Sequence, residues 1–319
     1  MESRRIGASG LQGSSVGLGG NNFGGRLDKL ATRNVVHRAL DIGVTFFDTA
    51  DAYGKRGGGQ TGQSEEFVGE ALGARRKDVV LATKFGNAMD AERRLSGASR
   101  RYISAAVEAS LKRLGTDWID LYQLHSPDPA TPIEETMRAL EDLVRAGKVL
   151  YIGCSNLAAW QFVHAQWSAR CAGVSQFVSC QNEYSLVNRS VERRLMPAMK
   201  AHGGSILPYY PLASGLLTGK YQPNQAAPAG SRFANPERFE RRFMTDLVQK
   251  TVEGLRAFAQ ERGHTLLELA MSWLACQPLV GPIIAGATSP EQVSANVAAA
   301  GWRLSADELA EIDRITGAG

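Results

Sequence analysis

Eight short apolar runs alternate along the chain with amphipathic helical patterns, and this alternation limits the possible folds more than any other feature. Each run is rich in Val, Ile, Leu or Phe, as expected for strands buried on both faces. Strands that alternate with helices form parallel sheets, and eight such units predict a closed (β/α)8 barrel of the TIM type. The runs are residues 15–19, 46–48, 79–84, 118–125, 149–153, 177–181, 205–209 and 280–285.

Helical patterns follow each of these runs and complete the predicted barrel. They cover residues 32–41, a segment from 64, 99–114, a segment with Pro132 in its first turn, 157–170, 188–201, 246–262 and 290–299. Two more patterns, at 266–275 and 306–315, predict additional helices in the C-terminal part of the chain. Because no linker or break in composition interrupts the pattern, we expect residues 1–319 to form one α/β domain.

The composition excludes several classes of protein. With 44% hydrophobic residues, 21% charged residues and a net charge of +4, the chain is ordinary for a globular protein and lacks a basic stripe for nucleic acid. No stretch approaches the roughly 20 apolar residues of a membrane span. The first residues lack the apolar core of a signal peptide, so we expect a cytoplasmic protein. Its four widely spaced cysteines predict reduced thiols and no metal site.

Four polar residues stand at or just after the ends of neighbouring strand-like runs. Asp48 ends the second run, Tyr53 lies in the loop after it, Lys84 ends the third and His125 ends the fourth. Active sites of such barrels lie at the carboxyl ends of the strands, so we expect the four side chains to converge. Singly, three of them have plainer explanations as a turn aspartate, a half-buried tyrosine and a loop histidine. Lys84 does not, because a lysine that closes a buried strand needs a partner or a shifted pKa.

Together, these side chains suit protonation of a carbonyl oxygen. A tyrosine with a pKa of about 10 is a poor acid near neutrality, and we expect the ammonium of Lys84 to lower that pKa. Asp48 would keep Lys84 charged, and His125 would align the carbonyl oxygen. Tyr53 would then protonate the alkoxide that forms when a hydride reaches the carbonyl carbon. A cofactor must supply the hydride, because no side chain can.

Three long motifs occur in the order found in one known family. They are residues 43–54 (GVTFFDTADAYG), 111–121 (LKRLGTDWIDL) and 147–156 (GKVLYIGCSN). Over nearly its whole length the chain resembles the aldo-keto reductases, and most closely the branch that contains potassium-channel β subunits and their bacterial relatives. The resemblance implies that Asp48, Tyr53, Lys84 and His125 are the catalytic tetrad. It also implies NADP(H), bound in extended form at the barrel mouth.

Polar residues after the fifth, sixth and seventh runs are candidates for holding the nicotinamide. The chain lacks a GxGxxG dinucleotide fingerprint, so the barrel loops must provide the contacts. Ser155, Asn156 and Gln181 carry groups that could grip a carboxamide, although Ser155 and Asn156 also suit a helix cap. The resemblance implies the same role for these three, and implies that Tyr210 stacks beneath the nicotinamide ring.

The long connection after the seventh run is suited to a pyrophosphate. It begins with a Gly/Ser-rich loop that ends in a base, and Arg232 further along provides a second candidate phosphate contact. A loop of this length often covers a site, so we predict that residues 213–245 fold over the bound cofactor. The candidate contacts in this connection are Pro211, Leu212, Ser214, Gly215, Leu217, Lys220 and Arg232.

A helix start after the eighth run offers backbone N–H groups to a further phosphate, or is simply an N-cap. The candidate contacts are Gly286, Thr288, Gln292 and Asn296. Many aldo-keto reductases carry lysine and arginine at the positions of Gly286 and Gln292, where these bind the 2′-phosphate of NADP. This chain departs from that pattern, so its expected use of NADP depends on Lys220 and Arg232.

The substrate expected from the resemblance is a small aldehyde or ketone. We expect Phe23, after the first run, and Phe85, directly after Lys84, to wall its pocket. Ser126 beside His125 is small, which favours a pocket open to ring-bearing carbonyl compounds.

Two other classes of function compete with carbonyl reduction. Lys84 could form a Schiff base in an aldolase or lyase, although that chemistry would leave Ser155, Asn156 and Gln181 without a role. Alternatively, the chain could bind cofactor with little turnover and act as a redox-sensing subunit of a partner protein. Sequence patterns leave the oligomeric state open.

Overall fold

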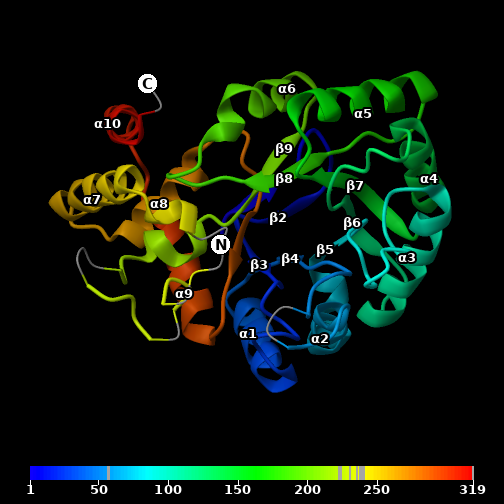
Figure 1. The fold of residues 1–319 in the computed structure, drawn as a ribbon, viewed down its shortest axis with the longest axis horizontal. Coiled ribbons are helices and arrows are strands. Elements are labelled where there is room, and N and C mark those ends of the chain that lie inside the picture. The colour runs from blue at the N-terminus through cyan, green and yellow to red at the C-terminus, as the bar shows by residue number, and fades with distance from the viewer. Residues whose placement is uncertain (56–57, 222–224, 230, 235, 237–240, 318–319) are drawn as a thin grey trace.

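The computed structural model describes residues 1–319 except 56–57, 222–224, 230, 235, 237–240 and 318–319. Parallel strands close into a barrel in the order β10-β3-β4-β5-β6-β7-β8-β9 (Figure 1). The predicted (β/α)8 barrel is therefore confirmed. The barrel strands are β3 (Val16–Gly19), β4 (Phe46–Asp48), β5 (Val80–Phe85), β6 (Ile119–Leu124), β7 (Val149–Ser155), β8 (Ser179–Glu183), β9 (Ser205–Tyr209) and β10 (Ile283–Gly286).

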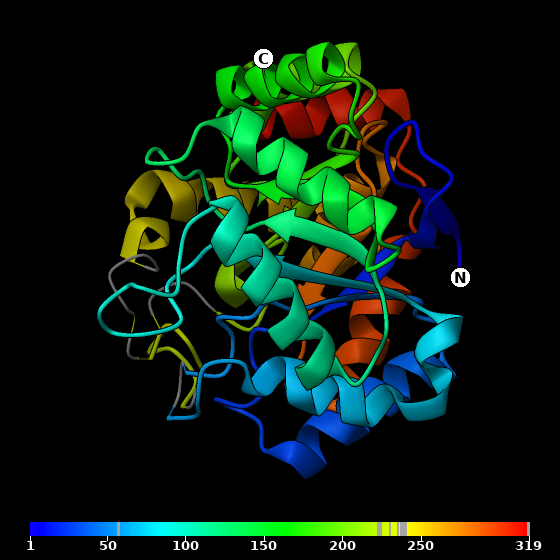
Figure 2. The ribbon, with the colours of Figure 1, turned by 90° about the vertical axis from the view of Figure 1, so that its right-hand side faces the viewer.

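Helices surround the strands, and Figure 2 shows those from α1 to α5, coloured blue to green, around the outside of the barrel. Among the described residues, none of these helices is long and apolar enough to cross a membrane. The helices are α1 (Lys29–Asp41), α2 (Gln63–Leu72), α3 (Arg100–Leu114), α4 (Ile133–Arg145), α5 (Ala159–Ala172), α6 (Leu195–Ala201), α7 (Asp246–Glu261), α8 (Leu266–Cys276), α9 (Pro290–Ala298) and α10 (Ala306–Thr316).

The single helix predicted over residues 188–201 is wrong. The structure has a 3-10 turn, η2 (Ser190–Arg193), followed by α6. Pro197 is the cause: it has no N–H to donate, and its ring would clash with the carbonyl of Arg193 in a continuous helix. Proline is tolerated in a first turn, and that is where α6 places it.

An N-terminal hairpin that the sequence patterns did not indicate closes one end of the barrel. Its strands β1 (Ser3–Arg5) and β2 (Gln12–Ser14) pair antiparallel. Ile6 and Leu11 between them pack with Phe46, Ala82 and Leu121 inside the barrel. Phe46, Ala82 and Leu121 lie two positions before Asp48, Lys84 and Gln123 on the same strands, and so nearer to the amino ends of these strands. The hairpin therefore closes the amino-terminal end of the barrel, opposite the mouth.

Alternation along the strands determines which side chains reach the barrel interior. Residues two apart on a strand share a face. The apolar interior layer contains Phe46, Ala82 and Leu121. One step further toward the carboxyl ends, the same face carries Asp48, Lys84 and Gln123, all buried. The interior is therefore apolar at the closed end and polar just below the mouth.

Candidate active site

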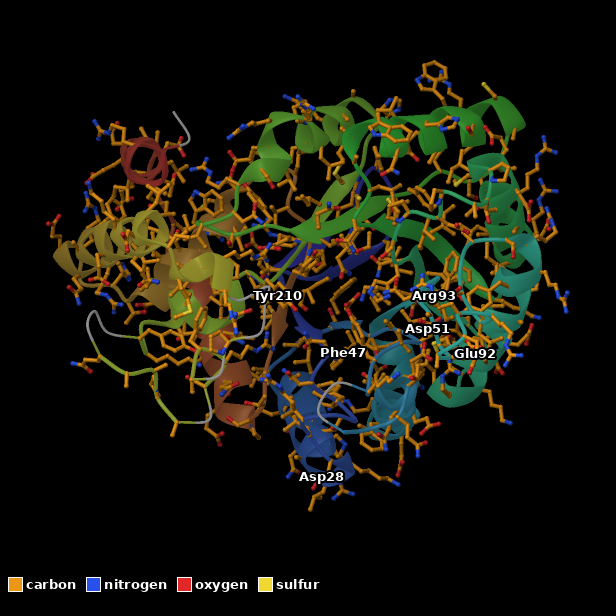
Figure 3. All side chains as sticks on the ribbon, in the orientation of Figure 1. Asp28, Phe47, Asp51, Glu92, Arg93 and Tyr210 are labelled. Carbon is orange, nitrogen blue, oxygen red and sulfur yellow. The ribbon has the colours of Figure 1, made fainter. Side chains whose placement is uncertain are left out.

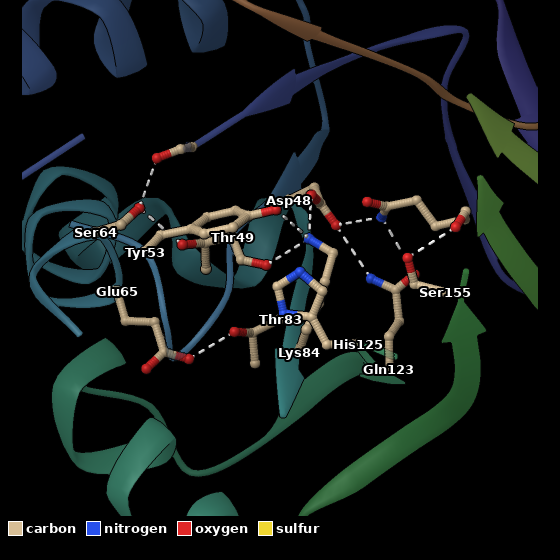
Figure 4. A network of polar contacts seen from close by, with 12 residues as sticks. Asp48, Thr49, Tyr53, Ser64, Glu65, Thr83, Lys84, Gln123, His125 and Ser155 are labelled. Atoms are coloured by element: carbon tan, nitrogen blue, oxygen red, sulfur yellow. Dashed lines mark hydrogen bonds and ion pairs between the residues drawn. The ribbon is translucent and has the colours of Figure 1, made fainter. Parts of the chain in front are cut away.

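Lys84 lies at the centre of the polar layer (Figure 4). Its Nζ donates to Asp48 Oδ2 at 2.6 Å and to the Thr49 carbonyl oxygen at 2.8 Å. The hydroxyl of Tyr53 lies 3.4 Å from the same Nζ. In the register of β4 and β5, Asp48 is opposite Ala82, two residues before Lys84, so both charged side chains point to the same interior face. The structure thus brings together three of the four predicted catalytic residues by direct contact.

The ion pair keeps Lys84 charged although its side chain is completely buried. Burial lowers the pKa of Lys84, but the neighbouring Asp48 and Tyr53 raise it by more, and the net pKa is above the ordinary value. An ammonium with a raised pKa is a poor Schiff-base nucleophile, because that reaction needs the neutral amine. The state of Lys84 suits electrostatic stabilisation instead.

Tyr53 differs from the sequence-based expectation in the direction of its pKa. Burial raises the pKa of Tyr53, and this effect outweighs the lowering by Lys84. The expected net lowering is therefore wrong. Tyr53 keeps its proton through the neutral range and can donate it. Lys84 remains the nearby cation that would stabilise the phenolate left behind.

His125 follows β6 and forms an edge-on contact with Tyr53, with ring centroids 5.6 Å apart. Burial, together with the charge of Lys84, lowers the pKa of His125 to about 3. The imidazole is therefore neutral near pH 7. Its Nδ1 is buried without a hydrogen-bond partner among the described residues. The ring can act as a neutral hydrogen-bonding group beside the phenol.

The carboxylate of Asp48 has further partners that extend the cluster around the barrel. Gln181 Nε2 donates to Asp48 Oδ1 at 2.8 Å, and Gln123 Nε2 donates to the same oxygen at 3.1 Å. Ser155 Oγ donates to the Gln181 carbonyl oxygen at 2.7 Å. Gln123 was not predicted, although its position two residues before His125 on a buried strand was a usable signal.

Asn156 connects His125 to the far side of the mouth. Its Nδ2 donates to the His125 carbonyl oxygen at 3.0 Å, and its Oδ1 accepts from the Tyr209 hydroxyl at 2.8 Å. Asn156 has a φ of 61°, a left-handed conformation that asparagine tolerates better than most residues. Tyr209 was also missed. It ends β9 two residues after Leu207, which faces the interior, and alternation along the strand would have placed it at the mouth.

These side chains border a cavity of about 870 Å³, which Asp48, Tyr53 and His125 line directly. Tyr210 comes from the side of the barrel near α8 and α9, apart from Phe47 and Asp51 near α2 (Figure 3). The predicted cofactor positions on the cavity wall are Ser155, Asn156, Gln181, Tyr210, Pro211, Leu212, Ser214, Gly215, Lys220, Arg232, Gly286, Thr288, Gln292 and Asn296.

Four predicted site residues do not line this cavity. One is Lys84, which is fully buried and contacts the cavity-lining Asp48 and Tyr53; the others are Phe85, Phe23 and Leu217. Phe85 follows the inward-facing Lys84, so alternation turns its ring outward, where it stacks on Tyr122 at 4.7 Å. Phe23 is 1% exposed and packs in the core between sheet and helices. Leu217 is fully buried there as well. The structure therefore corrects the placement of both phenylalanines as pocket walls and of Leu217 as a wall contact.

The loop after β3 contributes wall residues that the sequence reasoning overlooked. Asn21, Asn22, Arg26 and Leu27 line the cavity on this side. Asn22 Nδ2 donates to the Ala287 carbonyl oxygen at 3.3 Å, which connects this loop to the one after β10. The general placement of barrel sites in βα loops was the available signal.

The wall formed by β9, β10 and their loops has an unusual backbone. Tyr210, Ala213 and Ser214 all have positive φ, at 52°, 45° and 59°. Arg232 donates to Ser214 Oγ at 3.5 Å and to Asn22 Oδ1 at 3.4 Å, so it spans two loops. The predicted cover, residues 213–245, falls partly outside the described residues. Its described parts include η3 (Ala213–Thr218) and η4 (Arg241–Met244).

The start of α9 is both a capped helix end and part of the cavity wall, so the two predicted roles of this segment occur together. The Ser289 side chain accepts from the Gln292 N–H and caps the helix. The amide and hydroxyl of Thr288 donate to Gln292 Oε1 at 2.9 Å and 3.1 Å. Gln292 is exposed and Asn296 is buried.

Among the described residues, no group of three or more His, Cys, Asp or Glu could hold a metal ion.

Comparison with known proteins agrees with this geometry. The sequence model of the Aldo/keto reductase family matches residues 15–316. A probable voltage-gated potassium channel subunit beta of Arabidopsis thaliana is 37% identical, over 94% of this chain and 91% of its own length. The uncharacterized oxidoreductase YrpG of Bacillus subtilis is 37% identical over 92% and 89%. L-glyceraldehyde 3-phosphate reductase of Escherichia coli K12 is 32% identical over 98% and 92%.

The chain is an eight-stranded α/β barrel with a buried Lys–Asp–Tyr cluster at its mouth. The matches above identify the class more closely: the chain belongs to the aldo-keto reductase family.

Proposed function

We propose that this protein reduces aldehydes or ketones to alcohols by hydride transfer from NADPH, with Tyr53 as the general acid. The observation that carries the proposal is the contact of Tyr53, which keeps its proton and lines a large cavity, with a charged and fully buried lysine. The neutral ring of His125 forms an edge-on contact with the ring of the same tyrosine. A carbonyl oxygen between Tyr53 and His125 would meet an acid and a hydrogen-bonding group.

The residues present fit a nicotinamide dinucleotide. A cavity of about 870 Å³ is near the upper end of the range for small-molecule sites, as an extended dinucleotide requires. Among the described wall residues, Arg26, Lys220 and Arg232 are cationic, and the one acid is Asp48, which Lys84 neutralises. This excess of positive charge suits phosphate groups. When bound, the cofactor would supply the hydride.

Gln181 and Ser155 would hold the carboxamide, close to Asp48 and Lys84. Tyr209 is held by Asn156 at the end of β9, and we infer that it forms the platform for the nicotinamide ring together with, or in place of, Tyr210. Lys220 would contact the pyrophosphate, and Arg232 would contact the 2′-phosphate, which favours NADPH over NADH. Tyr53 would transfer its proton to the substrate oxygen, and the Lys84 ammonium would stabilise the resulting phenolate until a proton from solvent restores the phenol.

Steady-state assays of NADPH and NADH oxidation with a panel of aldehydes and ketones test this proposal. We expect turnover with several carbonyl compounds and a higher kcat/KM with NADPH. Absence of turnover with every compound, despite tight NADPH binding, would contradict the proposal and favour the second candidate below. A stable adduct at Lys84 after borohydride treatment with a carbonyl compound would instead revive the Schiff-base alternative.

The second candidate function is a cofactor-binding subunit that senses redox state with little turnover. The observation that favours it is the 37% identity to a probable channel subunit beta over 94% of the chain. Single-turnover experiments distinguish the two. A sensor would oxidise bound NADPH once and release product slowly, whereas an enzyme would cycle in the steady state.

A further inference from the structure

Gln123 is a polar residue in the middle of the barrel wall that the proton transfer described above does not use. It lies on β6 directly beside Lys84 of β5 and Gly153 of β7 in the strand register. Its side chain is fully buried. Burial of an amide is costly unless the amide is hydrogen-bonded, so the partners of Gln123 are informative.

Those partners are Asp48, which belongs to the proposed proton-transfer cluster, and Gln181, which belongs to the proposed carboxamide site. Gln123 Nε2 donates to Asp48 Oδ1 at 3.1 Å, and Gln123 Oε1 accepts from Gln181 Nε2 at 3.3 Å. Gln181 Nε2 also donates to Asp48 Oδ1 at 2.8 Å. Asp48, Gln123 and Gln181 therefore form a closed triangle of hydrogen bonds, and the remaining Asp48 oxygen binds Lys84.

This triangle determines how Gln181 presents its amide. Because Nε2 of Gln181 points to Asp48 and Gln123, its Oε1 must point elsewhere. That oxygen has no hydrogen-bond partner among the described residues, and Gln181 lines the cavity. An outward Oε1 is an acceptor, which matches the N–H₂ of a carboxamide and does not match a carbonyl oxygen.

Space for this arrangement is built into the neighbouring strand. A Cβ on Gly153 would lie 3.2 Å from Gln123 Cγ and 2.7 Å from Ser179 Oγ, so a larger residue there would press on the Gln123 side chain. The glycine thus leaves the room in which Gln123 reaches across to Asp48 and Gln181.

We propose that Gln123 is a positioning residue that couples the Asp48–Lys84–Tyr53 cluster to the carboxamide-binding face of Gln181. It does so by holding one oxygen of Asp48 and one nitrogen of Gln181 at the same time. The inference rests on the proposed function, because it assumes that a carboxamide binds at Gln181. It adds that acid and cofactor are aligned by one shared hydrogen-bond triangle.

The test replaces Gln123 by methionine, which keeps the length of the side chain and removes both hydrogen bonds. We expect Gln123→Met to lower kcat by about tenfold, the usual effect of losing a hydrogen bond to a charged group. The Kd for NADPH should rise several-fold. The Kd for 2′-phospho-ADP-ribose, which lacks the nicotinamide, should stay within twofold of wild type. A merely structural role would weaken both ligands alike.

Two companion variants complete the experiment. Tyr122→Phe is the matched control on the same strand. Tyr122 stacks on Phe85, and its hydroxyl has no hydrogen-bond partner among the described residues, so we expect wild-type kinetics. Gln123→Glu keeps the acceptor for Gln181 but places a second carboxyl group beside Asp48. We expect it to lower kcat more than the methionine variant, with the loss easing at lower pH as the added carboxyl is protonated.

A double-mutant cycle with Gln181→Met decides whether the two amides act as a unit. Coupling through Asp48 predicts that the double variant loses clearly less than the product of the single losses. Independent losses, unchanged kinetics in both Gln123 variants, or equal weakening of NADPH and 2′-phospho-ADP-ribose would overturn the inference. If wild type neither binds NADPH nor turns over, the proposed function itself fails, and that result is separate from any variant. If Gln123→Met melts early, the same ligand comparison is made on Gln123→Glu.

Discussion

The two ends of the cavity are built differently. At the Tyr53 end, Tyr53 itself lies in the loop after β4, but the side chains that support it come from strands. Lys84, Gln123 and Gln181 are at most 2% exposed and are joined through hydrogen bonds to Asp48. At the other end, candidate phosphate contacts come from loops. Lys220 is exposed, Arg232 is half-buried, and several residues have left-handed backbone conformations.

The difference follows from what each end must do. Proton transfer requires groups held within a fraction of an ångström, and strands packed on both sides provide that rigidity. Phosphates are recognised mainly by charge, and long side chains on loops can adjust to them. We therefore expect substitutions at the strand end to change kcat and stability, and substitutions at the loop end to change cofactor affinity.

Tyr53→Phe should have the largest effect on activity. Loss of the general acid is expected to lower kcat by about a thousandfold, within the range for this kind of catalysis. The hydroxyl has a single described polar contact, to Lys84 at 3.4 Å, so stability and NADPH affinity should change little. Steady-state kinetics measure kcat, and a fluorescence titration with NADPH measures the affinity. A loss below tenfold would mean that another group protonates the substrate.

Lys84→Met should have the largest effect on stability. It leaves Asp48 charged and buried without its cation, which costs roughly 3–5 kcal/mol of unfolding free energy. The double variant Asp48→Asn/Lys84→Met should recover most of that loss, because no unpaired charge remains. Urea denaturation of the wild type and both variants measures these free energies of unfolding.

The matched control for this prediction is Lys29→Met. Lys29 pairs with Glu70 on the surface at 2.7 Å, with both side chains more than half exposed, and its loss should cost below about 1 kcal/mol. Equal stability of Lys84→Met and wild type would show that Asp48 takes up a proton when Lys84 is lost.

The strand end was also the more predictable from sequence. Asp48, Lys84 and His125 follow apolar runs that the alternation with helices identifies as barrel strands, so their convergence follows from the fold. Phe85 shows what was overlooked: a residue next to an inward Lys84 must face outward on a strand. Gln123 and Tyr209 obey the same rule and could have been found by counting two residues back from His125 and two residues on from Leu207.

The loop end and the energetics were harder to predict for physical reasons. Contacts such as Arg232 with Asn22 join residues 210 positions apart through irregular backbone, which no periodic pattern encodes. The pKa of Tyr53 depends on a balance between burial and the charge of Lys84. A sequence shows the charge of the lysine but not how deeply the tyrosine is buried. For the same reason the sequence suggested a lowering where the folded protein has a rise.

The pH dependence of stability should reveal the buried histidine of the strand end. The pKa of His125 is lowered to about 3 in the folded protein, against about 6.5 when unfolded. Between these values the unfolded chain binds more protons, so stability falls as the pH falls below 6.5. From pH 7 to pH 5 the His125 contribution amounts to a loss of up to roughly 2 kcal/mol. His125→Gln should lose less stability over this interval than wild type.

Arg232→Ala should have the smallest of these effects and should be confined to affinity. Loss of one cation from the loop end is expected to weaken NADPH binding by about tenfold, the scale of one charge-assisted hydrogen bond. NADH, which lacks the 2′-phosphate, should bind within twofold of wild type, and kcat with saturating NADPH should change little. Lys250→Ala, at an exposed position of α7, is the control. Calorimetric titrations at two salt concentrations measure the change, and the salt dependence of NADPH binding should become shallower in Arg232→Ala because one ionic contact is missing. A large fall in kcat would contradict the expectation that loop-end residues affect only cofactor affinity, since it would show that Arg232 also positions the reacting groups.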